Sequence, residues 1–132
     1  MPKPTVCGAV AILFVCLVGC GSRQPLRVTG IQLGRSLNAD RTIADHTSSF
    51  APSDSIYVSV ATAGFGSGTI SVRWMYGGRL LDEPKKQVSY RDIAATDFSL
   101  QSPAGFPLGE YSVQVFLDGQ QVGNRTFRVE VR

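Results

Sequence analysis

Cysteine is absent from the sequence after position 20, because Cys7, Cys16 and Cys20 all lie in the first 20 of 132 residues. The part of the chain that follows therefore has no internal disulfide and no thiolate metal site. His46 is the only histidine, and a zinc site needs three or four ligands. We therefore expect no metal and no cofactor, and a domain that depends on its hydrophobic core.

A concentrated run of one charge is also missing. The chain carries 13 basic and 10 acidic residues, a net charge of +3, and its longest basic run is the pair Lys85-Lys86. Nucleic-acid-binding domains usually show a basic stripe, so we expect no nucleic-acid partner. With 43% hydrophobic and 17% charged residues, the composition is that of one globular domain rather than a disordered chain.

No hydrophobic run reaches the length of about 20 residues that a membrane-spanning helix needs. The longest apolar stretch is 6–18; Lys3 precedes it and Gly19, Gly21 and Ser22 follow closely. A positive start, a short apolar stretch and then small residues are typical of a secretory signal peptide. We therefore expect residues 1–19 to be a signal peptide.

The end of this stretch, Leu17-Val18-Gly19-Cys20, resembles the lipobox of bacterial lipoproteins. The resemblance implies that Cys20 becomes the first mature residue and carries the lipid, with a tether over 20–25 and a folded domain over 26–132. An uncleaved anchor or a plain signal peptide is the alternative. Since no Asp follows the cysteine, the resemblance extends to the outer-membrane class of enterobacterial lipoproteins. That implies a lipid-anchored protein of the bacterial cell envelope that faces the periplasm.

Beyond the tether, the chain is organised around residues 69–76, where apolar and polar side chains alternate about the single tryptophan, Trp74. A period of two predicts a strand with one buried face. Similar alternation predicts strands over 26–33, 55–61, 79–81, 84–91, 97–100 and 111–117, and a final strand that points Phe127, Val129 and Val131 inward.

Glycines mark the expected turns, bulges and one connection of these strands. Gly77-Gly78 and Asp118-Gly119 are signals for two-residue hairpins. Changes of parity near Gly30 and Gly123 predict bulges. The glycine-rich stretch 62–68 lacks the lysine of a phosphate-binding loop, so we interpret it as a mobile connection. Residues 34–55 show no clean periodicity, and we expect Ile43 and Phe50 to be buried beneath them.

About seven short strands and no helix predict an all-β protein, an antiparallel β-sandwich. Val60, Trp74 and Val113 resemble the core positions of an immunoglobulin-like domain, with valines in place of the two cysteines. Tyr111, in Gly-Glu-Tyr-Ser-Val, resembles the tyrosine corner of that fold. The last hairpin resembles immunoglobulin-like modules of bacterial envelope proteins. This implies an immunoglobulin-like β-sandwich used for binding or architecture, with no enzymatic chemistry.

If Trp74 faces inward, its strand and the two C-terminal strands turn a second set of side chains outward. Arginine and aromatic residues are enriched at the cores of protein interfaces. We therefore predict a partner-binding face made of Arg73, Met75, Gln114, Phe116 and Arg128. The alternative is that these are ordinary surface residues.

Three functions follow, in order of preference. The first is a lipid-anchored, non-enzymatic module that binds another envelope protein. The second is a domain that binds a small ligand or glycan, which needs an aromatic pocket near Phe65, Tyr90 or Phe106. The third is a hydrolase, which needs His46 to meet Asp45 or Asp40 and a serine such as Ser48 or Ser49 in one site.

Overall fold

The computed structural model describes residues 24–131, so the signal peptide and Cys20 lie outside the described residues. The described part contains nine strands, and it contains no helix long and apolar enough to cross a membrane. The strands are β1 (Arg27–Gly34), β2 (Ser49–Phe50), β3 (Ile56–Ala63), β4 (Gly66–Tyr76), β5 (Arg79–Asp82), β6 (Lys85–Tyr90), β7 (Ala94–Leu100), β8 (Gly109–Leu117) and β9 (Gln120–Val129).

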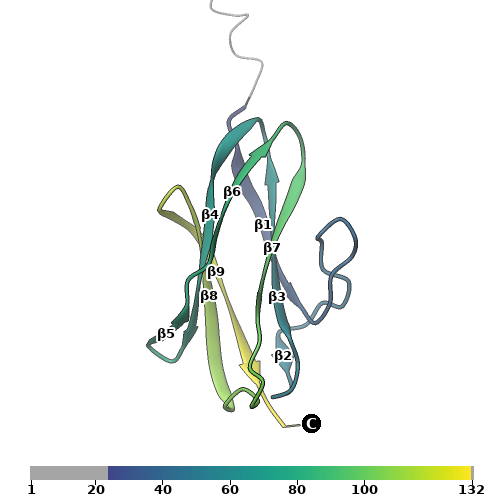
Figure 1. Cartoon of the computed structure of the whole chain (residues 1–132), viewed down its shortest axis with the longest axis vertical. Coiled ribbons are helices and arrows are strands. Elements are labelled where there is room, and N and C mark those ends of the chain that lie inside the picture. Colours follow the sequence, from purple (N-terminus) through teal and green to yellow (C-terminus); the bar gives the residue numbers. More distant parts are fainter. Residues whose placement is uncertain (1–23, 132) are drawn as a thin grey trace, which may run out of the picture.

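The strands form two layers, as Figure 1 shows. The smaller sheet has the order β1-β3-β7, and the larger has the order β2-β9-β8-β4-β5, with β6 also paired to β4. All pairs are antiparallel except β2 with β9. Because β5 and β6 pair with different halves of β4, they form one interrupted edge of the larger sheet.

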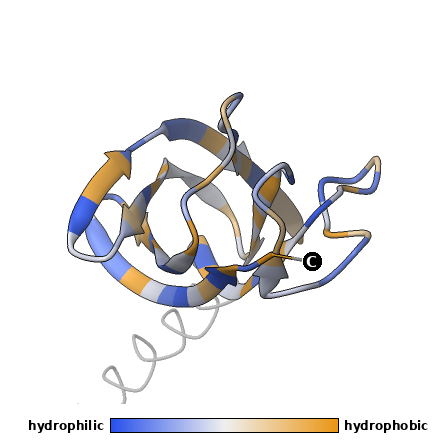
Figure 2. Ribbon diagram, turned by 90° about the horizontal axis from the view of Figure 1, so that it is seen from below, coloured by the Kyte–Doolittle hydropathy of each residue, from blue (hydrophilic) through white to orange (hydrophobic). Residues whose placement is uncertain are grey.

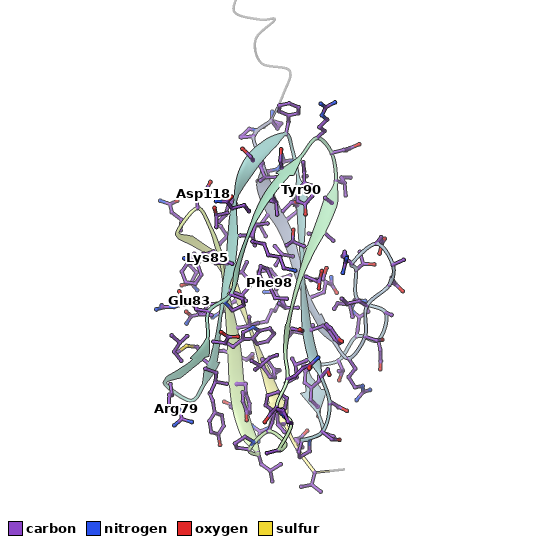
Figure 3. All side chains as sticks on the ribbon, in the orientation of Figure 1. Arg79, Glu83, Lys85, Tyr90, Phe98 and Asp118 are labelled. Atoms are coloured by element: carbon purple, nitrogen blue, oxygen red, sulfur yellow. The ribbon has the colours of Figure 1, made fainter. Side chains whose placement is uncertain are left out.

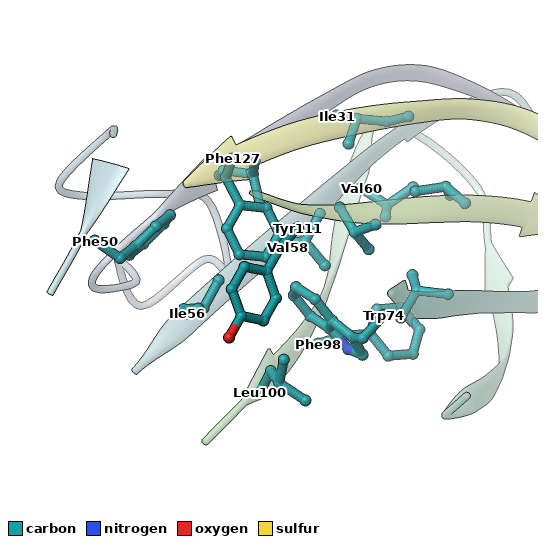
Figure 4. Close-up of a cluster of buried hydrophobic side chains, with 14 of the residues drawn as sticks. Ile31, Phe50, Ile56, Val58, Val60, Trp74, Phe98, Leu100, Tyr111 and Phe127 are labelled. Carbon is teal, nitrogen blue, oxygen red and sulfur yellow. The ribbon is translucent and has the colours of Figure 1, made fainter. Parts of the chain in front are cut away.

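The core lies between the two sheets and is built from the inward residues of the alternating strands. Trp74 is fully buried and makes an edge-to-face contact with Phe127, their ring centroids 6.1 Å apart. Figure 4 shows these rings in one cluster with Val60 of β3 and Leu100 of β7. Tyr111 and Val113 are buried as well. Trp74 is thus the largest side chain of a core that is shared by both sheets.

Turn and bulge signals in the sequence are confirmed with one refinement. Asp118 and Gly119 both have positive φ between Leu117 and Gln120, as a type I′ hairpin requires. In the Gly77-Gly78 hairpin only Gly77 has a positive φ. The pairing shifts register beside Gly30 and at Val122, which confirms the two bulges.

The prediction of a mobile loop over 62–68 is wrong. β3 continues to Ala63 and β4 begins at Gly66, so only Gly64 and Phe65 connect them. Edge strand β6 pairs with β4 from Gly66 to Ser71, and this ladder holds the glycines extended. Pairing with a neighbour thus outweighs the low strand propensity of glycine.

The C-terminal strand also ends earlier than predicted. β9 stops at Val129, and Val131 is 73% exposed instead of pointing inward. The two-residue strand β2 was not predicted; it places the fully buried Phe50 against Phe127, with ring centroids 5.5 Å apart. Phe50 therefore closes the core at the end where Val131 was expected.

The tyrosine corner is present. The Tyr111 hydroxyl donates a hydrogen bond of 2.6 Å to the carbonyl oxygen of Pro107, which fixes the start of β8 against the preceding loop. Burial raises the pKa of Tyr111, and the neighbouring Tyr76 raises it further. The hydroxyl therefore stays protonated and able to donate well into the alkaline range.

Replacing Tyr111 with phenylalanine should lower the free energy of unfolding by about 1 kcal/mol, because the partly buried hydrogen bond to the Pro107 carbonyl is lost. Urea unfolding measured by far-ultraviolet circular dichroism would check this. Since the folded pKa is raised, the tyrosine's contribution should be full below pH ~10 and fall as pH rises through the folded pKa. A Tyr111→Phe chain as stable as the wild type would contradict the structural role of this hydrogen bond.

Candidate functional site

The five residues predicted as a partner-binding face lie on the outer surface of the larger sheet. Their strands β4, β8 and β9 are neighbours, and each residue alternates with buried ones. In the register, Arg73 is opposite Gln114, Met75 is opposite Ser112, Phe116 is opposite Ser71 and Arg128 is opposite Glu110. The structure thus places all five on one face, though not in one cluster.

Arg73 is the centre of the first cluster. Its guanidinium carbon lies 5.8 Å from the centroid of the Phe116 ring, within the range of a cation–π contact. Its Nε lies 3.1 Å from Oε2 of Glu83, an ion pair that lacks the alignment of a hydrogen bond. Both charged side chains remain partly exposed. The Nε atom itself is shielded from solvent, but a pair between two side chains this exposed contributes about 0–1 kcal/mol, so another acidic group can replace Glu83 at little cost.

Leu80 extends this cluster, and the sequence analysis missed it. The Gly77-Gly78 hairpin brings Leu80 of β5 opposite Met75, and its side chain is 44% exposed. In a hairpin with a two-residue turn, the second residue before the turn is opposite the second residue after it, so the sequence could have predicted that Met75 is opposite Leu80. We use the name outer patch for Arg73, Met75, Leu80, Glu83 and Phe116.

Arg128 belongs to a separate cluster. Its NH1 lies 3.0 Å from Oε2 of Glu110, and its Nε lies 3.9 Å from Oε1 of Glu130. Along β8, Glu110 is six residues from Phe116, a distance of about 20 Å. Arg128 therefore lies outside the outer patch, and Gln114 lies between the two clusters.

The outer surface of the smaller sheet is different, because the segment 35–48 folds over it. The Ser59 hydroxyl on β3 donates to the carbonyl oxygen of Arg41 at 2.8 Å, and the Arg41 side chain pairs with Asp97 on β7 at 3.5 Å. Ile43, which belongs to this segment, is buried. Figure 2 shows the segment as a mainly hydrophilic loop beside the sandwich. The loop therefore leaves the larger sheet as the more open of the two faces.

The residues proposed for hydrolytic chemistry do not converge on a site. His46 is exposed, and its backbone forms an isolated bridge with Gly34. The Asp45 carboxylate binds Arg35, with Oδ2 3.0 Å from Nε. Asp40 accepts hydrogen bonds from the side chain and backbone of Thr42, which lower its pKa. Across residues 24–131, no group of three acidic, histidine or cysteine side chains could hold a metal ion.

An aromatic pocket does exist beside Phe106. It has a volume of about 230 Å³ and opens at the edge between β5 and β7, near Arg79 in Figure 3. It is lined by Tyr76, Arg79, Leu81, Leu100, Gln101, Ser102, Phe106, Pro107 and Tyr111. Ligand pockets usually measure about 300–1,000 Å³, so this one is small. Tyr90 instead bonds to Thr96, their hydroxyl oxygens 2.9 Å apart.

Comparison with solved structures identifies the fold. The chain superposes on an immunoglobulin-like protein from Pseudomonas aeruginosa with a TM-score of 0.56 and 15% identity, over 83% of this chain and 100% of the other. It also superposes on a β-glucosidase from Listeria innocua in complex with glucose, with a TM-score of 0.51 and 14% identity.

That second match covers 82% of this chain but only 16% of the β-glucosidase, so the likeness is to one part of that enzyme. No protein-family model and no curated protein matches the sequence. At such low identity the likeness concerns the fold. The described chain is an immunoglobulin-like β-sandwich, as the sequence predicted.

Proposed function

We propose that this protein is a lipid-anchored, non-enzymatic module of the bacterial cell envelope that binds another envelope protein through the outer patch. The observation that carries the proposal is the difference between the two outer faces. One is partly covered by the 35–48 segment, whereas the other presents Arg73 and Phe116 in contact and partly exposed.

The chemistry of the outer patch suits a protein partner. Phe116, Met75 and Leu80 offer apolar area, and Arg73 adds a planar group that a carboxylate or an aromatic ring can pair with. A partner that supplied an acidic side chain would replace Glu83, whose ion pair with Arg73 is exposed and weak. An envelope protein with an apolar surface beside an acidic group fits this patch best.

A lipid on Cys20 supports this role, because it confines the domain to the membrane where such a partner resides. Tethering raises the effective concentration of two proteins, so a modest patch is enough for association. The anchor lies outside the described residues and rests on the lipobox alone. By that resemblance the domain sits on the outer membrane and faces the periplasm.

The test is photocrosslinking in living cells from position 116. A photoreactive residue at Phe116 should give one discrete crosslinked product, which mass spectrometry can identify. Ser99 is the matched control, because it is exposed on β7 between buried Phe98 and Leu100 and therefore faces away from the other sheet.

Substitutions measure how much the outer patch contributes to binding the partner. Arg73→Ala or Phe116→Ala should reduce recovery of that product's partner about tenfold or more, because central interface residues often contribute at least about 2 kcal/mol. Ser99→Ala, on the outer surface of the smaller sheet, should leave recovery unchanged. Equal crosslinking from positions 99 and 116, or full recovery with both patch variants, would contradict the proposal.

The aromatic pocket favours a second candidate, the binding of a small ligand or glycan. Three rings line it, from Tyr76, Phe106 and Tyr111. A bound glycan should raise the melting temperature, because a ligand at 100 times its Kd stabilises the folded state by about 2.7 kcal/mol. A glycan library that leaves the melting temperature unchanged would remove this candidate.

A further inference from the structure

The end of the sandwich where the described chain begins carries two exposed apolar side chains. Ile93, in the β6–β7 connection, is 80% exposed, and Phe65, in the β3–β4 connection, is 43% exposed. Figure 1 shows both connections at the end where β1 starts, opposite the C-terminus. Arg91 belongs to the same end, since it lines a shallow hollow together with Gln24 and Phe65.

The start of the chain is fixed to this end by backbone contacts. The Phe65 amide donates to the carbonyl oxygen of Gln24 at 2.9 Å, and Pro25 forms a parallel bridge with Phe65. Gly64 makes this approach possible: its φ is +96°, and a Cβ at that position would lie 2.1 Å from the Pro25 oxygen. Any tether that precedes Gln24 therefore emerges beside the two apolar side chains.

The length of the tether decides which end can reach a membrane. From Cys20 to Gln24 the chain spans at most about 14 Å even when fully extended. The opposite end of the sandwich is further away, since the 11 residues of β4 alone extend over roughly 36 Å. The headgroup layer is about 5–7 Å thick on each side of the hydrocarbon core. A lipid on Cys20 can therefore bring only the Phe65 and Ile93 end to the bilayer.

We propose that this end is a membrane-contacting tip, in which Ile93 and Phe65 enter the interfacial layer of the bilayer and Arg91 and Arg27 bind lipid phosphates. The inference rests on the proposed lipid anchor at Cys20. Aliphatic and aromatic side chains on a polar surface gain free energy at this depth, and arginine pairs with phosphate. Both arginines are exposed, and Arg27 is opposite Ala63 at the end of β3.

The acidic residue Asp92 also lies within the tip, where the two positive charges of Arg27 and Arg91 outnumber its negative charge. The Asp92 side chain turns back to accept a hydrogen bond from the Ile93 amide at 2.8 Å, which orders the turn that presents Ile93. A tip that contacts the bilayer fixes the orientation of the domain relative to the membrane as well as its position on it. The sandwich then stands with its long axis away from the membrane, and the outer patch faces sideways.

The test uses the full-length lipidated protein in vesicles of phosphatidylethanolamine and phosphatidylglycerol with brominated acyl chains. Since the mature chain has no cysteine besides Cys20, Ile93→Cys gives a single site for a fluorescent label. Leu108→Cys is the control, because Leu108 is also exposed but lies in the β7–β8 loop at the other end.

Flotation with the vesicles should be the same for both labelled proteins. The label at position 93 should be quenched at least about twofold more strongly than that at 108, because an interfacial side chain lies about 5–10 Å deep. Flotation with equal quenching at the two positions would overturn the tip and leave the anchor intact. Loss of flotation in the unlabelled wild-type protein would overturn the anchor, and with it the tip.

Discussion

Replacing Trp74 with alanine should lower the free energy of unfolding by about 3–5 kcal/mol, the largest change expected from any single core substitution in this chain. Trp74 is fully buried and packs edge-to-face on Phe127 between the two sheets. With no disulfide in the described domain, the lost contacts have no covalent support. A domain of this size is stabilised by only about 5–15 kcal/mol in total, so the variant should be near the limit of folding.

A conservative variant separates packing from the polar part of this side chain. The Nε1 of Trp74 is buried and has no hydrogen-bond partner among the described residues. Trp74→Phe removes this unsatisfied donor, whose burial is unfavourable by about 1–3 kcal/mol, and keeps an aromatic ring. It should therefore destabilise the domain by only about 1–2 kcal/mol, since the gain offsets part of the lost packing.

The measurement is urea unfolding of residues 21–132, followed by circular dichroism because tryptophan fluorescence is lost in both variants. Met75→Ala is the matched control, since Met75 is the next residue on β4 and points to the outer face. It should change the free energy of unfolding by less than about 1 kcal/mol. If Trp74→Ala were as mild as this control, the packing role assigned to Trp74 would be wrong.

The parts of the fold that sequence reasoning predicted are those where a local pattern has one physical meaning. Residues 69–76 alternate because one face of β4 is buried and the other is wet, and a shift of one residue would expose Trp74. Asp118-Gly119 tolerates two residues of positive φ, which few dipeptides do. The apolar residues change parity beside Gly30 and Gly123. This indicated bulges, because one extra residue is needed there if the apolar side chains on both sides are to point inward.

The parts that were missed depend on partners distant in the sequence. The glycines of 62–68 are extended because β6 pairs with them, and no local signal reports that pairing. β2 consists of two residues whose pairing with β9 spans most of the domain. Segment 35–48 has no periodicity, since it is held by scattered contacts such as that of Ser59 with Arg41.

The candidate site shows the same division. Alternation correctly predicted that Arg73, Gln114, Phe116 and Arg128 lie on one outer face, because successive side chains of a strand point to opposite faces of the sheet. It did not indicate distance along the strands, so Arg128 was grouped with Phe116, which lies about 20 Å away along the sheet. The acidic partners of the two arginines, Glu83 and Glu110, come from tertiary pairing that the pattern does not contain.

Changing Cys20 to serine should have the largest effect on the behaviour of the protein in the cell. The lipid proposed at this residue would provide several acyl chains, and each buried CH₂ contributes about 0.8 kcal/mol to membrane binding. Without the thiol, incorporation of labelled palmitate should be lost. The ratio of membrane-bound to soluble protein after cell fractionation should fall by about tenfold or more, since one acyl chain alone gives only marginal binding.

Cys16→Ser is the matched control, because Cys16 lies in the same apolar stretch but outside the lipobox position. It should keep both palmitate incorporation and membrane binding. A Cys20→Ser protein that remained labelled and membrane-bound would contradict lipidation at this residue. So would equal losses in the two variants, which would point to a general disturbance of the signal peptide.

The same experiment separates the anchor from the tip. Full burial of a side chain such as Ile93 or Phe65 contributes about 1.5–3 kcal/mol, and these two are already partly covered. Together they are too weak to hold the protein on a membrane at cellular concentrations, so the Cys20→Ser domain should be soluble with its tip unchanged. In the proposed arrangement, the lipid therefore determines whether the protein is on the membrane, and the proposed tip determines how the sandwich, and with it the outer patch, is turned toward a partner.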